Sequence, residues 1–193
     1  MDQLVRLAPI GLCADPFAPT DADGVPKALR PEVDSLSDPL LREGLEWWRG
    51  LSGPADDDGH HSLPDRSRIE APAIKTLLPN TMLWDVSEDR HGGLQFRCRL
   101  AGTLLVEMLG QEVTGRWLHE LFGEETACMH RELGAVVRMR RPYYSVHQMS
   151  WAGKPYYRYC RLMLPFTHHA RHLPGDDPQR VALLCNLVSF IGA

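Results

Sequence analysis

Nine histidines and five cysteines are the side chains of this chain best suited to hold a metal ion. Two histidine groups stand out, His60 with His61, and His168 with His169 and His172, and both lie in polar, loop-like stretches. A structural zinc site usually takes four converging ligands, often including cysteine. No cysteine stands beside either group, and the cysteines form no CxxC pair. We therefore expect solvated loop histidines and no metal site.

The other reactive side chains form no recognisable catalytic arrangement. A serine or cysteine nucleophile needs a base and an orienting group. The sequence contains neither a Gly-x-Ser-x-Gly motif nor a glycine-rich phosphate loop. Cys98, Cys160 and Cys185 lie in apolar or alternating runs, where a free thiol behaves as a small hydrophobic group. We expect no enzyme, and the open alternative is a small-molecule enzyme whose catalytic residues are scattered along the chain.

Composition and charge restrict the classes of partner. With 44% hydrophobic and 24% charged residues, the chain resembles an ordinary globular protein. Its net charge of −4 lacks the basic excess of a nucleic-acid binder. Arg6 and Pro9 interrupt the N-terminal apolar run, and no run approaches the roughly 20 apolar residues of a membrane helix. We expect a cytoplasmic protein that binds neither nucleic acid nor membrane, and free cysteines suit that reducing compartment.

The elements that must position these side chains begin after a proline-rich segment. Residues 1–35 are expected to form an extended or flexible tail, because proline removes backbone donors and resists helix. Residues 36–193 are expected to form a single domain with an N-terminal helix. Asp38-Pro39 should start that helix, as a capping residue followed by a residue suited to the first turn. Its apolar face repeats at helical spacing in Leu41, Leu45 and Trp48.

From residue 80 the hydrophobic period changes from helical to two, which predicts strands. A short helix is expected just before, at 71–78. A half-buried strand with Met82, Trp84 and Val86 on one face is expected to pair with the segment 94–100 as an antiparallel hairpin. The connection ends in glycines 92 and 93, which favour a turn.

Three helices are expected next, over 104–109, 117–122 and 124–141. Thr103 should cap the first and Gly110 should end it, while Glu124 and Glu125 should open the third. Three more strands are expected at 143–151, 156–164 and 181–191, the last apolar on both faces as in a covered central strand. The order ββ-ααα-βββ predicts an α+β fold, a five-stranded antiparallel sheet with helices on one face plus the N-terminal helical extension.

Several stretches, in this order, resemble the stand-alone bacterial PAS-like domain family, formerly a domain of unknown function. The resemblance covers roughly residues 38–190. It rests on Leu45-Glu46-Trp47-Trp48, Leu63-Pro64-Asp65-Arg66, Leu77-Leu78-Pro79-Asn80, Phe96-Arg97-Cys98-Arg99-Leu100-Ala101-Gly102-Thr103, Gly110 and Thr114-Gly115-Arg116.

The resemblance implies a non-catalytic sensory or regulatory module for signal transduction. Such a module would bind a signalling partner protein, or itself as a homodimer through the Trp47/Trp48 helix or the sheet face. A small organic ligand would lie between the inner sheet face and the helices within 103–122, in a largely apolar pocket. The pocket candidates are Trp84, Phe96, Trp117, Tyr144, Tyr157 and Asn186, although residues of this kind serve the core more often than they contact a ligand.

Haem or another cofactor is the alternative ligand, because some PAS domains hold haem through a histidine on the helices. His119 and His130 lie on predicted helices, but charged residues flank both, which favours partly exposed side chains. Flavin photochemistry would need a cysteine in an Asn-Cys-Arg setting between helices. Cys98 belongs to a strand and has no such setting, so that chemistry is rejected.

Overall fold

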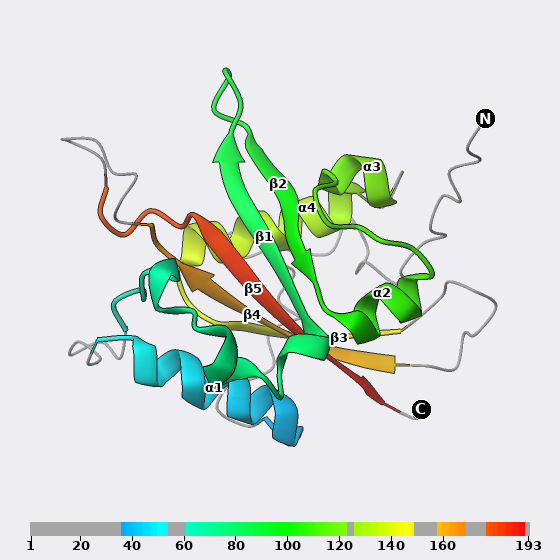
Figure 1. The fold of residues 1–193 in the computed structure, drawn as a ribbon. Helices are drawn as coiled ribbons and strands as arrows, with labels where there is room; N and C mark the ends of the chain where they lie inside the picture. Colours follow the sequence, from blue (N-terminus) through cyan, green and yellow to red (C-terminus); the bar gives the residue numbers. More distant parts are fainter. Residues whose placement is uncertain (1–35, 54–60, 123–125, 149–157, 169–176, 192–193) are drawn as a thin grey trace.

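The computed structural model describes residues 36–53, 61–122, 126–148, 158–168 and 177–191. Its strands form one antiparallel sheet in the order β2-β1-β5-β4-β3 (Figure 1). Their bounds are β1 Thr81–Glu88, β2 Leu94–Ala101, β3 Tyr143–Gln148, β4 Arg158–Phe166 and β5 Leu183–Ile191. The predicted five-stranded sheet, divided two plus three by helices, is confirmed. The predicted tail at 1–35, the predicted helix opening at Glu124 and Glu125 and the connection between the strands predicted at 143–151 and 156–164 lie outside the described residues.

The first two strands form the expected hairpin. Gly92 has a φ of 78°, a conformation that glycine adopts without steric cost. The side chain of Asp89 accepts hydrogen bonds from the backbone N–H groups of His91 and Gly93 at 2.8 and 2.9 Å. These bonds close the turn and lower the pKa of Asp89.

The half-buried pattern predicted for β1 is wrong over its first half. All four residues from Thr81 to Trp84 are buried, and exposure begins only at Asp85. The reason is the place of β1 in the sheet. It pairs with β2 on one side and β5 on the other, so its first half lies inside the sheet. The period-two pattern marked the strand correctly but could not show how it was covered.

One helix covers one face of the sheet. In α1 (Pro39–Leu51), Asp38 caps the first turn as predicted, with its side chain accepting from the backbone N–H of Leu41 at 3.0 Å. The indole of Trp48 donates to the backbone oxygen of Pro165 at 2.9 Å. Gly44 leaves room for Leu187, because a Cβ there would clash with the Leu187 side chain. We call this side the α1 face, and its β5 members are Leu183, Cys185 and Leu187.

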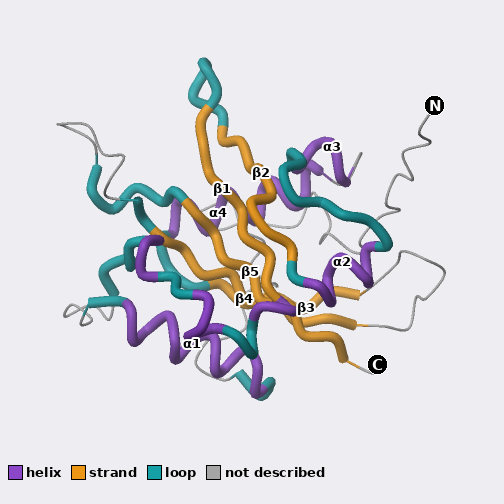
Figure 2. The backbone as a smooth tube through the Cα atoms, in the orientation of Figure 1, coloured by secondary structure: helices purple, strands orange, loops and turns teal. Residues whose placement is uncertain are grey.

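Three helices cover the opposite face, as Figures 1 and 2 show. They are α2 (Thr103–Leu109), α3 (Leu118–Phe122) and α4 (Thr126–Met139). We call this side the cavity face, and its β5 members are Leu184, Asn186 and Val188, because alternate residues of a strand point to opposite faces. The prediction that the last strand is covered on both sides is therefore confirmed.

The start of α2 differs from the prediction. The capping residue is Gly102, and Thr103 is the first helical residue. Gly102 donates to the backbone oxygen of Thr81 at 2.7 Å, and a Cβ at this position would clash with the carbonyl oxygens of Leu78 and Pro79. This close approach of two backbones decides where the helix begins. Gly110, with a φ of 70°, ends α2 as predicted.

The helix predicted at 71–78 is replaced by two 3₁₀ turns, η4 (Ala71–Ile74) and η5 (Leu78–Asn80). Pro79 lacks a backbone donor and disfavours α conformation at the residue before it. Another 3₁₀ turn, η3 (Arg66–Arg68), is capped by the side chain of Asp65. These turns lead the chain from α1 into β1.

Candidate functional site

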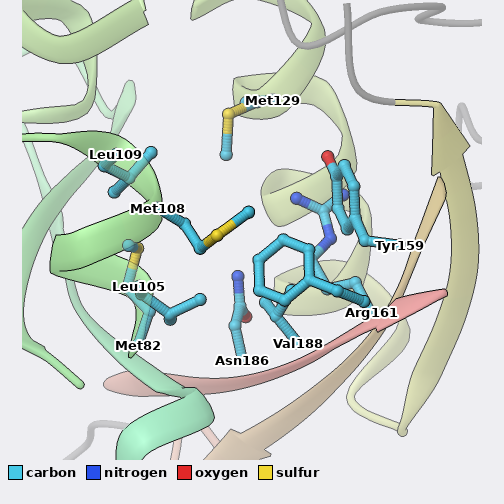
Figure 3. Close-up of a pocket in the computed structure, with 10 residues that line it drawn as sticks. Met82, Leu105, Met108, Leu109, Met129, Tyr159, Arg161, Asn186 and Val188 are labelled. Carbon is cyan, nitrogen blue, oxygen red and sulfur yellow. The ribbon is translucent and has the colours of Figure 1, made fainter. Parts of the chain in front are cut away.

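A cavity lies between the cavity face of the sheet and the helices α2 and α4 (Figure 3). Strands β1, β4 and β5 form its floor with Met82, Tyr159, Arg161, Asn186, Val188 and Phe190. Helices α2 and α4 form its wall and roof with Leu105, Met108, Leu109 and Met129. Most of these side chains are apolar, and a few polar groups converge among them, which is the usual build of a small-molecule site.

Asn186 supplies the clearest polar group of the cavity. Its side chain is 2% exposed, and among the described residues no group donates a hydrogen bond to its Oδ1. Figure 3 shows the amide projecting from β5 into the space between Met108 and Arg161. A buried acceptor without a donor destabilises a fold by roughly 1–3 kcal/mol. Such a group is therefore a place where a ligand or an internal water would gain a hydrogen bond.

Arg161 supplies the charge of the cavity. It comes from β4 and forms a buried ion pair with Glu132 of α4, each side chain being 4% exposed. Burial is the largest influence and lowers the pKa of Arg161. The attraction of Glu132, its hydrogen bond and the smaller effects of Tyr159 and Tyr143 together outweigh burial, so the net shift raises the pKa above its ordinary value. Arg161 therefore stays charged, and its charge is balanced by the carboxylate beside it.

The cavity is small in this structure, with a volume of about 60 Å³. A single water needs roughly 10–15 Å³ by this kind of measure, and an engineered cavity that binds benzene has about 150 Å³. The space therefore holds a few water-sized groups and is too small for a macrocycle such as haem. Methionine side chains are flexible and adapt to irregular shapes, so movement of Met82, Met108 and Met129 is the simplest way to enlarge it.

Two of the predicted pocket residues, Trp84 and Phe96, lie in the core and do not line the cavity. Trp84 is 0% and Phe96 1% exposed. Phe96 packs edge-on against His130 of α4, with ring centroids 5.2 Å apart. Among the described residues, the indole N–H of Trp84 has no acceptor. Phe96 therefore packs β2 against α4, and both rings belong to the hydrophobic core.

Trp117 lies in a different place, beside the outer edge of β2. Its backbone bridges to Arg97, whose guanidinium lies over the indole ring at 5.7 Å from the centroid. The two residues line a polar groove of about 530 Å³ that also contains Arg66, Asp85 and Arg180. Asp85 pairs with Arg66 at 3.2 Å, and partly exposed pairs of this kind contribute little to stability. Trp117 is therefore separate from the apolar cavity.

One of the two tyrosine candidates is described, and it does not line the cavity. Tyr144 in β3 donates its hydroxyl hydrogen to Cys160 Sγ at 3.0 Å and does not line the cavity. Tyr157 lies outside the described residues. Of the six predicted pocket residues, only Asn186 is among the described cavity-lining side chains.

Neither histidine proposed for haem lines the cavity. His119 is exposed and stacks on Trp117, with ring centroids 6.5 Å apart. His130 is half-buried, and its Nε2 lies 2.7 Å from the backbone oxygen of Leu94. That contact engages a nitrogen that an iron would need. The residues present do not fit a histidine-ligated haem in this cavity.

Arg161 and Glu132 were not among the predicted site residues, although the sequence contains a signal for both. Arg161 interrupts the apolar run of β4, and its strand neighbours Cys160 and Leu162 are buried. Glu132 falls on the buried stripe of α4, three residues after Met129 and next to Leu133. A charge of each sign, each within a buried run, indicates a buried ion pair. Because Glu132 and Arg161 are far apart in the sequence, the sequence does not show that they pair with each other.

The described residues contain neither a cluster of metal ligands nor a helix that could span a membrane. Within the described ranges, no three His, Cys, Asp or Glu side chains come together in a way that could hold a metal ion. His60, His169 and His172 lie outside those ranges. In the same part of the chain, no helix has the length and apolar character to cross a bilayer.

Comparison with known proteins agrees with this architecture. A family model described as a PAS domain matches residues 41–173, which is more than half of the chain. The match runs from α1 through β4 and includes α2 and α4. A search of curated proteins found no match. The match covers strands β1 to β4 and helices α2 to α4, while β5 lies beyond it. Because it covers more than half of the chain, the chain belongs to the PAS domain family.

Proposed function

We propose that this chain is a non-catalytic sensory module that binds a small molecule in the cavity between α2, α4 and the sheet. PAS domains are generally sensory or regulatory. The observation that carries the proposal is the buried amide of Asn186, which lines an apolar cavity and whose Oδ1 lacks a donor among the described residues. A core residue without a binding role gains nothing from that arrangement.

An occupant of the cavity would contact two helices. Met108 belongs to α2 and Met129 to α4, and both line the space. Because the cavity is small, any molecule of the size of a benzene ring must displace these side chains or the helices that carry them. The bound state would then differ from the free state on the outer surface of α2 and α4. We propose this surface difference as the signal that a partner protein reads.

A homodimer through the Trp47/Trp48 helix stays a prediction. Trp48 is 1% exposed, and Trp47 packs on Phe166 with ring centroids 5.7 Å apart. Both tryptophans therefore serve the packing of α1 on its own sheet. A partner would have to use the polar side of α1, the sheet edge or the helices of the cavity face.

Native mass spectrometry of the whole chain tests the proposal, because it reports bound mass and subunit number together. We expect a small-molecule adduct on the wild-type protein, or one after addition of phenol. Met108→Trp should abolish the adduct by filling the cavity, whereas Glu107→Trp, on the exposed side of the same helix, should retain it. Failure of the wild-type protein to bind, or equal binding by both variants, would contradict the proposal.

Two optical and kinetic measurements address the alternatives. An absorption band near the Soret region in the purified protein would favour haem. Turnover of an ester or nucleotide that Asn186→Leu abolishes would favour an enzyme. Neither result is expected, because no described histidine lines the cavity and its only charged pair is neutral overall.

A further inference from the structure

The charge balance of the cavity restricts what can bind there, if the proposed ligand site is correct. Arg161 is the only charged residue that lines the described cavity, and Glu132 already neutralises it. An entering carboxylate would leave one excess negative charge in a buried place, at a large desolvation cost. An entering ammonium group would meet the guanidinium. Both kinds of ion are therefore disfavoured.

Asn186 adds a requirement for a polar group on an otherwise apolar molecule. Its amide can accept through Oδ1 and donate through Nδ2. A hydroxyl group matches both, because it can donate and accept. A pure hydrocarbon would leave the Oδ1 without a donor, as it is now among the described residues. The apolar side chains of Leu105, Met108 and Val188 surround the rest of the space.

We infer that the cavity is specific for small neutral hydroxyl compounds, such as phenols and short alcohols, and that the Glu132–Arg161 pair excludes carboxylates. The volume of about 60 Å³ limits the occupant to a small alcohol in the present shape. A phenol-sized ring fits after the methionines move. This inference rests on the proposed ligand site and adds the chemical class of the ligand.

Isothermal titration calorimetry with phenol, toluene and benzoate at neutral pH tests the inference, since the three probes share a ring and differ in polar group. We expect phenol to bind about tenfold more tightly than toluene, which corresponds to one hydrogen bond to a buried group. Benzoate should bind at least about tenfold more weakly than phenol. Asn186→Leu should reduce phenol binding to the level of toluene and leave toluene binding unchanged.

Glu132→Gln supplies the second arm, because it removes the compensating charge and keeps the shape. In this variant benzoate should gain at least about tenfold in affinity, while phenol should change little. A role of Glu132 in packing alone would not reverse the preference for the anion. If Glu132→Gln does not fold, the titrations of the wild-type protein and of Asn186→Leu with the three probes still test the ligand class.

The outcomes separate the two proposals. If none of the three probes binds the wild-type protein, the proposed ligand site fails and this inference with it. If phenol and toluene bind equally, or benzoate binds most tightly, the site stands and the ligand class is wrong. An unchanged preference for phenol over toluene in Asn186→Leu would likewise overturn the assignment of the hydroxyl contact.

Discussion

The two faces of the sheet differ in how closely their side chains pack and in the polar groups that they bury. On the α1 face, Gly44 and Leu187 approach closely and Trp48 seals the packing with a hydrogen bond to Pro165. On the cavity face, the neighbouring residue Asn186 lines the cavity, beside the buried ion pair of Arg161 and Glu132. One face is filled with apolar side chains, and the other contains polar groups and a gap.

This difference indicates that the two faces of the sheet serve different purposes. Close packing of apolar side chains is the main source of stability. Buried polar groups and cavities cost stability, and proteins retain such features where binding needs them. The α1 face therefore supports the fold, and the cavity face is where binding can be accommodated. The following variants break or sharpen that comparison, in order of decreasing effect.

The largest effect is expected from Trp48→Ala on the α1 face. Trp48 is almost fully buried, and truncation leaves a large cavity and removes a donor from Pro165. We expect a loss of about 3–5 kcal/mol in the free energy of unfolding, measured with urea. The matched control is Trp47→Ala on the same helix, where the side chain is only half-buried and the loss should be smaller. Equal losses would contradict the inward role of Trp48.

Breaking the ion pair should come next. Glu132→Leu leaves the Arg161 charge buried without its carboxylate, and we expect a loss of roughly 3 kcal/mol in the free energy of unfolding. The double variant Glu132→Leu with Arg161→Met should recover most of that loss, because apolar replacements of a buried pair are often neutral. A double variant as unstable as the single one would show that the pair itself stabilises the cavity face.

Two adjacent positions on β5 give the most direct comparison of the faces. Leu187→Ala on the α1 face should reduce the free energy of unfolding by about 2–4 kcal/mol. Asn186→Leu, one residue away on the cavity face, should leave it unchanged or raise it by about 1 kcal/mol, because an acceptor without a donor is removed. Chemical denaturation of both variants measures the difference. A clear loss in Asn186→Leu would mean that the amide is satisfied in solution.

The smallest effect at neutral pH concerns one thiol on each face. Burial raises the pKa of Cys185 from 9.0 to about 12. Burial, assisted by Glu112, raises the pKa of Cys98 from 9.0 to about 12. Below pH 9 both thiols are protonated, folded or unfolded, so their contribution is fully present. Between pH 9 and pH 12 only the unfolded chain loses these protons, so stability should fall.

Urea denaturation at pH 8 and pH 10 measures this contribution. Cys98→Ala and Cys185→Ala should each reduce the fall in stability between the two pH values. An unchanged fall in both variants would contradict the burial of the thiols.

The order of elements could be read from the sequence because each carries a local signal. Asp38-Pro39 opens a helix, Gly110 closes one, and period-two runs mark the strands. The cavity could not be read in the same way. Asn186, a polar residue in an apolar strand, lines the cavity, whereas the large rings of Trp84 and Phe96 lie in the core. Large aromatic rings fill space, so they mark a core more often than a cavity.

The amino-acid sequence by itself determined the sheet, its antiparallel hairpins and the family, because turn residues and hydrophobic period act over a few neighbouring positions. Only the tertiary structure decided that Glu132 meets Arg161, that Gly102 rather than Thr103 starts α2, and that Asn186 faces a gap. These facts depend on backbones and side chains that are distant in the chain and close in space. Their contacts carry no local pattern, because they form only when the two faces of the sheet are covered.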